Sequence, residues 1–473
     1  MHSFHLILYG ILASPAHSFI PPKHSEGVYR GENWLDVPTE SSLKPGIRYG
    51  LKKTRNVLPP ILHADKTNLP GSVPLNNDGH DISYIIEAEV GPKKQKLDLL
   101  LDSGAPHSWV MNSDCHTDAC KTHSTFDSDM PTSGSFKVGY GTGNVHGNYI
   151  NETITMGDIS VNFTFGSATS ASNEFLGYPI DGILGIGYAK ADQNPPSFMQ
   201  SVIADKILDQ NIIGINLFRH NEKKDGEIVF GDVDETRISG NVTYSPLIEN
   251  ASDWRIPFDG FSVGTNSVKY DKKVALVDTG TSYVLAPAKD IAKVHGFIKG
   301  SKKITDKTTQ NSYTVPCNTK TEIQLTFSGT NFTMSPKDFV GAPTANGSPD
   351  CQSNIVEQSV FGDDVWLVGD TFIKNIYLIL DWDEGRVGMA KRNYNDPQPT
   401  STPTSTASIE SATSQNLGSN LAPSALQSST TAGPHAAKPT TESSMANSSC
   451  PKSYTLALLS ALIAWMIISV ASN

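Results

Sequence analysis

The sequence predicts a mainly β protein made of two homologous lobes that share one active-site cleft. Two segments carry this prediction, because residues 100–104 read LLDSG and residues 276–280 read LVDTG. In each copy a strand-like apolar run ends in an aspartate, a small hydroxyl residue and a glycine, which places a carboxylate at a tight turn. Most of residues 80–392 reads as short strands separated by turn residues, so the class is mainly β.

A second repeated element follows each aspartate at a similar distance. It is an apolar pair closed by glycine, at residues 183–185 after Asp102 and at residues 367–369 after Asp278. Matching order and spacing indicate duplication of a whole lobe rather than a short-period repeat. Each lobe therefore contributes one carboxylate, and Asp102 and Asp278 together predict a two-carboxylate active site.

Local patterns predict particular strands and helices. Residues 84–90 and 226–230 read as strands, and residues 197–210 and 288–297 read as amphipathic helices that support the lobes. The apolar residues expected on the buried helix faces are Phe198, Val202, Ile203 and Ile207 in the first helix and Ile291 and Val294 in the second.

Between about residues 82 and 392, the chain resembles the pepsin-like aspartic proteases. Besides the two aspartate motifs, the matching segments in chain order are residues 140–143, 181–187, 254–256, 281–282 and 366–372. The resemblance implies a bilobal pepsin-like fold and an aspartic endopeptidase that acts on peptide or protein substrates. It implies no cofactor and no metal.

The resemblance also implies a role for each motif residue. Asp102 and Asp278 would activate a water, and because two adjacent carboxyls cannot both ionise easily, activity should be highest at acidic pH. Ser103 and Thr279 would cross-brace the two loops, and the flap would cover the substrate. The supporting residues are Ser103, Gly104, Thr279, Gly280 and Thr281, and the flap residues are Tyr140, Gly141, Thr142 and Gly143.

The chain departs from the family pattern at Ala105-Pro106-His107, where the family usually carries Ser-Ser-Asn. Ala105 lacks the hydroxyl that would hydrogen-bond the first carboxylate, so we expect a raised pKa for Asp102. The hypothesis is retained activity with a shifted pH profile. The alternative is a catalytically impaired cell-wall or binding protein that keeps the fold. His107 is expected to be a loop residue rather than a catalytic base.

Both ends of the chain read as processing or anchoring segments. Residues 1–18 resemble a secretory signal, and residues 19–70 a prosegment and leader with a basic cluster at residues 52–55. That cluster is a plausible processing site, with an ordinary exposed charge cluster as the alternative. The N-terminal lobe is expected at residues 71–245 and the C-terminal lobe at residues 246–394.

The C-terminal end resembles that of fungal surface-anchored, yapsin-like enzymes. Residues 395–449 are rich in Ser, Thr and Pro and read as a stalk, and residues 450–473 read as a GPI-anchor signal with attachment at Asn447 or Ser448. The apolar run ends without basic residues, which favours the anchor over a retained membrane span, although the span stays open. The expected location is the outer face of the plasma membrane or the cell wall.

The cysteines and glycosylation sequons also fit a secreted protein. By resemblance to the family, Cys115 pairs with Cys120 and Cys317 with Cys351, whereas Cys450 leaves with the anchor signal. Zinc binding is the alternative to a disulfide, but Cys115 and Cys120 lack a second pair of ligands at the spacing of a metal site. The sequons are at Asn151, Asn162, Asn241, Asn250, Asn331, Asn346 and Asn447.

Charge and missing motifs narrow the function further. The net charge of −11 argues against nucleic acid as a partner and suits work at acidic pH. The sequence has no His-Glu-x-x-His motif. Residues 139–143 resemble a nucleotide loop, but residues 149–154 read as a strand rather than the helix that such a loop needs. We expect a monomer.

Overall fold

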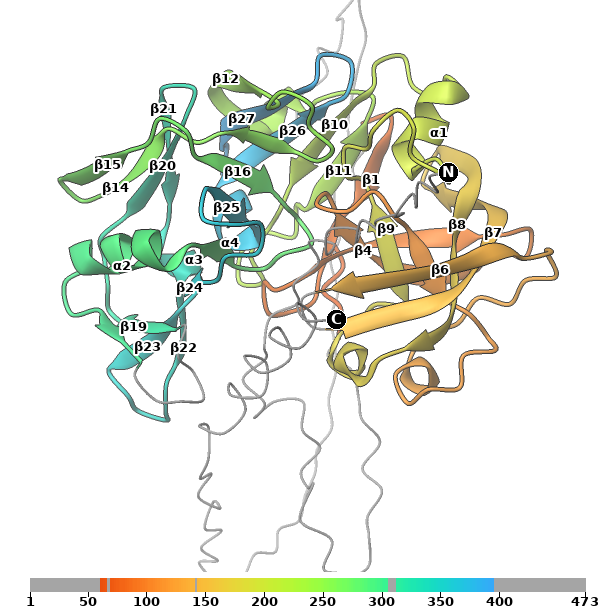
Figure 1. Cartoon of the computed structure of the whole chain (residues 1–473), viewed down its shortest axis with the longest axis horizontal. Coiled ribbons are helices and arrows are strands. Elements are labelled where there is room, and N and C mark those ends of the chain that lie inside the picture. Colours follow the sequence, from red (N-terminus) through yellow and green to blue (C-terminus); the bar gives the residue numbers. More distant parts are fainter. Residues whose placement is uncertain (1–59, 66–68, 141–142, 305–311, 395–473) are drawn as a thin grey trace, which may run out of the picture. The chain divides into compact units, whose positions relative to one another are not determined.

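The computed structural model describes residues 60–65, 69–140, 143–304 and 312–394. The expected signal, basic cluster, stalk and anchor signal therefore lie outside the described residues, as do Gly141, Thr142, Asn447, Ser448 and Cys450. The described part is mainly β, as predicted, and its strands form five sheets (Figure 1).

The N-terminal half is organised around an eight-stranded sheet. Its order is β2-β3-β4-β9-β5-β8-β7-β6, and β3 also pairs with β7, so the sheet folds back on itself. The strands are β2 (Asn76–Asn77), β3 (Tyr84–Val90), β4 (Gln95–Asp102), β5 (Trp109–Met111), β6 (Ser133–Tyr140), β7 (Gly143–Met156), β8 (Ile159–Ala171) and β9 (Gly182–Gly185). The predictions of strands at residues 84–90 and 149–154 are confirmed.

The C-terminal half contains one five-stranded and two four-stranded sheets. The five-stranded sheet consists of β13 (Arg255–Pro257), β16 (Val274–Val277), β25 (Val365–Val368), β17 (Val284–Ala286) and β24 (Ile355–Glu357). One smaller sheet consists of β15 (Asn266–Lys269), β14 (Gly260–Val263), β20 (Ile323–Phe327) and β21 (Thr330–Met334). The other consists of β18 (Lys302–Lys303), β19 (Tyr313–Pro316), β23 (Asp350–Ser353) and β22 (Val340–Pro343).

A six-stranded sheet combines strands from both halves of the sequence. Its strands, in order, are β1 (Ser72–Pro74), β11 (Glu227–Phe230), β10 (Ile212–Asn216), β26 (Ile376–Asp381), β27 (Arg386–Arg392) and β12 (Ile238–Pro246). The last two described strands thus pair with β10 and β12, which lie before residue 247. The strand predicted at residues 226–230 is confirmed as β11.

The strand pairing repeats between the two halves. In the first, β4 pairs in parallel with β9, which pairs antiparallel with β5, which pairs in parallel with β8. In the second, β16, β25, β17 and β24 pair in the same sequence of directions. The apolar-glycine segments are therefore the direct neighbours of the aspartate strands, and the predicted duplication into two lobes is confirmed.

The helices in the described ranges are few and short. They are α1 (Phe198–Ala204), α2 (Ala288–Phe297), α3 (Pro336–Phe339) and α4 (Asp370–Ile373), with 3-10 turns η2 (Cys120–Thr122), η3 (Asn173–Gly177) and η4 (Glu235–Arg237). The helix predicted at residues 288–297 is confirmed as α2, with Ile291 and Val294 buried on its inner face.

The predicted helix at residues 197–210 is wrong in its second half. Ser197 caps α1 through a reciprocal capping box with Gln200, but the helix ends at Ala204. Lys206 takes a positive φ of 53°, which no α-helix accommodates, and Ile207 turns back to bond the carbonyl of Val202. Ile203, expected on the inner face, is 36% exposed.

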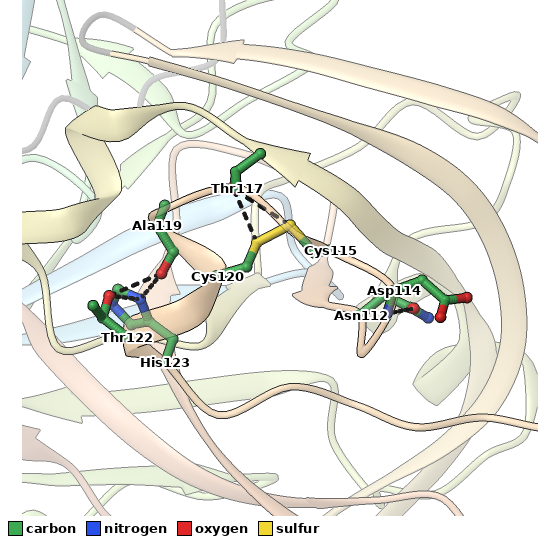
Figure 2. The surroundings of a disulfide bond; sticks show 8 residues. All are labelled: Asn112, Asp114, Cys115, Thr117, Ala119, Cys120, Thr122 and His123. Atoms are coloured by element: carbon green, nitrogen blue, oxygen red, sulfur yellow. Dashed lines mark hydrogen bonds between the residues drawn. A yellow bond between two sulfur atoms is a disulfide. The ribbon is translucent and has the colours of Figure 1, made fainter.

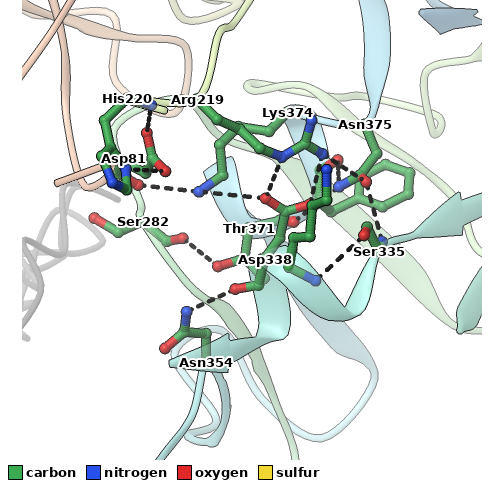
Figure 3. Close-up of polar contacts among 12 residues, drawn as sticks. Asp81, Arg219, His220, Ser282, Ser335, Asp338, Asn354, Thr371, Lys374 and Asn375 are labelled. Atoms are coloured by element: carbon green, nitrogen blue, oxygen red, sulfur yellow. Dashed lines mark hydrogen bonds and ion pairs between the residues drawn. The ribbon is translucent and has the colours of Figure 1, made fainter. Parts of the chain in front are cut away.

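The two lobes are joined by a buried polar network (Figure 3). The Arg219 guanidinium, from the N-terminal lobe, donates two hydrogen bonds of 2.7 Å to the carboxylate of Asp338 in α3. Both side chains are almost fully buried. A paired geometry of this kind is needed because either charge alone would be very costly to bury.

Within the described ranges, no helix is long and apolar enough to cross a membrane.

Candidate active site

Asp102 and Asp278 lie at corresponding positions, at the end of β4 and directly after β16. Both side chains are 0% exposed. The backbone N–H groups of Gly104 and Gly280 each donate to the Oδ1 atom of the aspartate two residues earlier, at 2.9 Å in both loops. The two turns therefore hold the two carboxyl groups in the same local geometry.

The two loops are linked by reciprocal hydrogen bonds. The Ser103 N–H donates to Thr279 Oγ1 and the Thr279 N–H donates to Ser103 Oγ, both at 3.0 Å. Each hydroxyl also crosses to the opposite strand, where Ser103 Oγ donates to the carbonyl of Val277 and Thr279 Oγ1 to that of Leu101. All four bonds are buried, so the residues expected to form a cross-brace are in position to hold the carboxyl groups together.

Three glycines allow the close approach. A Cβ on Gly185 or Gly369 would overlap the backbone of the neighbouring aspartate loop, at the carbonyls of Ala105 and Thr281 respectively. A Cβ on Gly280 would lie 2.5 Å from the carboxyl carbon of Asp102, which puts that carboxyl directly against the opposite loop.

The carboxyl groups of Asp102 and Asp278 lie close enough to influence each other's ionisation. Burial, followed by the negative charge of Asp278, raises the pKa of Asp102 well above its usual range. The hydrogen bonds from Gly104 and Ala105 oppose this shift. The pair thus holds a proton under conditions in which an isolated aspartate would be ionised.

The two carboxyl groups differ in the donors that reach their second oxygen. Thr281 Oγ1 donates to Asp278 Oδ2 at 2.6 Å. At the matching position, Ala105 offers only its backbone N–H, 3.1 Å from Asp102 Oδ1. No donor in the described part of the chain reaches the buried Asp102 Oδ2. The missing hydroxyl therefore leaves the first carboxyl less stabilised as an anion.

His107 is held within the N-terminal lobe by backbone packing. Its carbonyl lies against Gly185, and its ring is within 3.4 Å of Gln193 Nε2. Burial lowers the pKa of His107, which favours the neutral form of the ring.

The predicted flap residues belong to a hairpin formed by β6 and β7. Tyr140 and Gly143 are paired at its described end, and the tip between them lies outside the described residues. Trp109 Nε1 donates to Tyr140 Oη at 2.6 Å, and Phe175 packs edge-on against both rings. Burial, and then the charge of Asp102, raise the pKa of Tyr140 well above its usual value, so it stays a phenol.

Both expected disulfides are confirmed. Cys115 and Cys120 are bonded in the loop after β5, with Thr117 Oγ1 3.3 Å from one sulfur and 3.5 Å from the other (Figure 2). This loop packs in the same apolar cluster as Trp109 and Tyr140 and so supports the flap. Cys317 and Cys351 are bonded in the C-terminal lobe. These pairings leave no free thiolate for zinc at either position.

The surface sites are placed as follows. Six sequon asparagines are described and all are exposed, namely Asn151, Asn162, Asn241, Asn250, Asn331 and Asn346. Among the described residues, no group of three or more His, Cys, Asp or Glu side chains could hold a metal ion.

Sequence reasoning missed the surroundings of the second loop. Asp370 lies in a quoted motif but had no assigned role, and it is fully buried next to Asp278. Trp109 was not identified as the donor to the flap tyrosine. The Arg219–Asp338 pair left no sequence signal, because its members are far apart in the chain and only the fold brings them together.

Comparison with known proteins agrees with this geometry. Residues 83–392 match the family described as eukaryotic aspartyl protease. The chain is 41% identical over 349 residues to the aspartic-type endopeptidase ctsD of Aspergillus fumigatus, a match that covers 72% of each chain. It is 39% identical over 352 residues to the probable aspartic-type endopeptidase CTSD of Arthroderma benhamiae, covering 73% of this chain and 68% of the relative.

A more distant relative matches over a similar length. The chain is 30% identical over 339 residues to an aspartic protease of Phaffia rhodozyma, which covers 70% of this chain and 81% of the relative. Because the family match spans more than half of the sequence, the chain belongs to the eukaryotic aspartyl protease family, as its motifs predicted.

Proposed function

We propose that this aspartic endopeptidase hydrolyses peptide bonds in acid, with a water activated by Asp102 and Asp278. The observation that carries the proposal is the buried pair of neighbouring carboxyl groups on two loops cross-braced by Ser103 and Thr279. One carboxylate removes a proton from water as it attacks the scissile carbonyl, and the protonated carboxyl donates to the carbonyl oxygen. The proton taken from water then passes to the leaving nitrogen as the C–N bond breaks, and a hydroxyl of the tetrahedral intermediate returns its proton to the other carboxylate, without a covalent enzyme intermediate.

The hydrogen-bond asymmetry favours one division of roles. Asp278 receives a donor on each oxygen, from Gly280 and Thr281, and is the better-stabilised anion. Asp102 therefore holds the proton and acts first as the acid, while Asp278 acts as the base. Tyr140 and the flap close over the substrate and exclude water.

The experiment is cleavage of a mixed peptide library between about pH 3 and 7, the range in which such a pair titrates. The purified protein and its Asp278→Ala variant are compared, with and without pepstatin. Acid-range cleavage that is lost in the variant and blocked by pepstatin supports the proposal. If the folded protein, freed of its prosegment, cleaves nothing, the alternative of a binding protein is favoured. The reason to consider that alternative is that Ala105 lacks the hydroxyl found at this position in the family.

We also propose that the enzyme is secreted, glycosylated and held on the cell surface by a GPI anchor as a monomer. Support comes from the signal, stalk and anchor patterns in the sequence and from the exposure of all six described sequons. Release from cells by a phosphatidylinositol-specific phospholipase is the expected result. If the protein is found in the medium without phospholipase treatment, it is soluble. If it stays on the cells after phospholipase treatment, it keeps a membrane span.

A further inference from the structure

A third carboxyl group lies beneath the loop that holds Asp278. Asp370 is the first residue of α4 and is 0% exposed. Its backbone N–H donates to the carbonyl of Thr281 at 2.8 Å, and Thr371 binds the carbonyl of Ser282 through both its N–H and its hydroxyl, at 2.9 and 2.8 Å. The start of α4 thus fixes the segment that follows the second catalytic aspartate.

The side chain of Asp370 lacks the donors that an anion needs. Neither carboxyl oxygen receives a hydrogen bond from any donor in the described ranges. By contrast, each oxygen of Asp278 accepts one. A buried carboxylate without donors is very costly, whereas a protonated carboxyl is tolerated. Burial accordingly raises the pKa of Asp370 well above its usual range, with Lys374 only partly opposing the shift.

The nearby cation is already engaged elsewhere. Lys374, at the end of α4, donates to the carbonyl of Asp81 at 3.2 Å and lies 3.7 Å from Asp338 Oδ1 (Figure 3). Asp338 is in turn paired with Arg219. The main interactions of Lys374 are therefore with Asp81 and Asp338 rather than with Asp370.

Most other titratable groups around Asp370 are acidic. Those that act on it electrostatically, besides Lys374, are Asp278 after β16, Asp78 and Asp81 between β2 and β3, and Tyr84 on β3. The neighbouring strands β17 and β25 carry no charged residue, and Asp381 on β26 pairs with Arg386. A negative charge on Asp370 would thus meet several like charges and no free donor.

We propose that Asp370 is a positioning residue which must stay protonated for the Asp278 loop to keep its geometry, and that its ionisation inactivates the enzyme as the pH rises. The inference rests on the proposed function of Asp278. A group with a raised pKa in the folded state contributes stability that is complete below the unfolded pKa and is lost as the pH rises through the folded pKa. One such group changes the folding equilibrium constant by about tenfold per pH unit in that window.

The test is Asp370→Asn, which has nearly the same shape and cannot ionise. Asp209→Asn, at an exposed position, is the matched control. Each protein is incubated between about pH 5 and 8, the window above the ordinary aspartate pKa, and assayed for the peptidase activity that remains at acidic pH. Urea unfolding is followed by circular dichroism over the same range.

We expect Asp370→Asn to cleave peptide normally in acid and to retain structure and activity at least about one pH unit higher than wild type and control. An unchanged midpoint of inactivation, or a folded variant that is inactive in acid, would overturn the proposal. If the asparagine variant does not fold, Asp370→Ser replaces it, with the same two criteria. If wild type itself cleaves nothing, the proposed function fails, but the pH dependence of unfolding still decides the role of Asp370.

Discussion

The two aspartate loops have nearly the same backbone but different hydrogen bonding. In both, a glycine N–H binds the aspartate Oδ1 at 2.9 Å, and a serine or threonine hydroxyl crosses to the other loop. Only the second loop has a hydroxyl, that of Thr281, on the other carboxyl oxygen. Two copies of one motif can therefore present the same geometry and still differ in which carboxyl is easier to ionise.

The largest expected effect tests whether both loops are needed. Asp102→Asn and Asp278→Asn keep the side-chain shape but remove the proton exchange, so each should lower kcat by about 10²–10⁴-fold. Initial rates on a peptide substrate give the measurement, and circular dichroism controls for folding. A folded variant that keeps a large share of the wild-type rate would show that the two loops do not form one catalytic pair.

Thr281→Ala removes the donor that distinguishes the second loop. Because a hydrogen bond to a charged group contributes about 1.5–3 kcal/mol, kcat/KM should fall by roughly 10- to 100-fold. The pKa of Asp278 should rise, which moves the acidic limb of the pH–rate profile to higher pH. Thr281→Ser keeps the hydroxyl, so both kcat/KM and the position of the acidic limb should stay as in wild type. Equal effects of the two substitutions would mean that the methyl group matters rather than the bond.

Ser103→Ala disrupts the hydrogen-bonded brace between the two aspartate loops. It removes the acceptor of the Thr279 N–H and the donor to the Val277 carbonyl, both buried, so the free energy of unfolding should fall by about 1–3 kcal/mol. Urea unfolding measures this loss, with the exposed Ser160→Ala as a control expected within about 0.5 kcal/mol of wild type. Unchanged stability of Ser103→Ala would contradict the view that the brace joins the lobes.

Ala105→Ser should make the first loop resemble the second. A hydroxyl near Asp102 Oδ2 would stabilise the anion and lower its pKa, so the alkaline limb of the pH–rate profile should move down by about one pH unit. The maximal kcat should change little, since both carboxyl groups remain. A profile identical to that of wild type would show that the missing hydroxyl is irrelevant to the titration.

The sequence predicted best what is encoded locally and repeated. The aspartate turns, the strand after the flap and α2 all depend on short-range patterns and were placed correctly. The end of α1 was missed because its apolar spacing continues past Ala204, whereas the backbone at Lys206 turns to bring Ile207 back to the core. The local spacing of apolar residues could not predict this turn of the backbone.

The electrostatics of the site were predicted only in part. Ala105 signalled a missing donor, because the loss of a hydroxyl is visible by comparing the two motifs. Asp370 gave no such signal, since its lack of donors results from burial among elements distant in sequence. The same holds for Arg219 and Asp338, whose pairing exists only in the folded chain.

Locating the shared proton tests the comparison most directly. A neutron structure of the deuterated protein, at about pH 3, between the two pKa values of such a dyad, would show the deuteron itself. The hydrogen-bond asymmetry predicts a deuteron on Asp102 Oδ2 and an ionised Asp278 that accepts from Gly280 and Thr281. A deuteron on Asp278 with an ionised Asp102 would contradict the account.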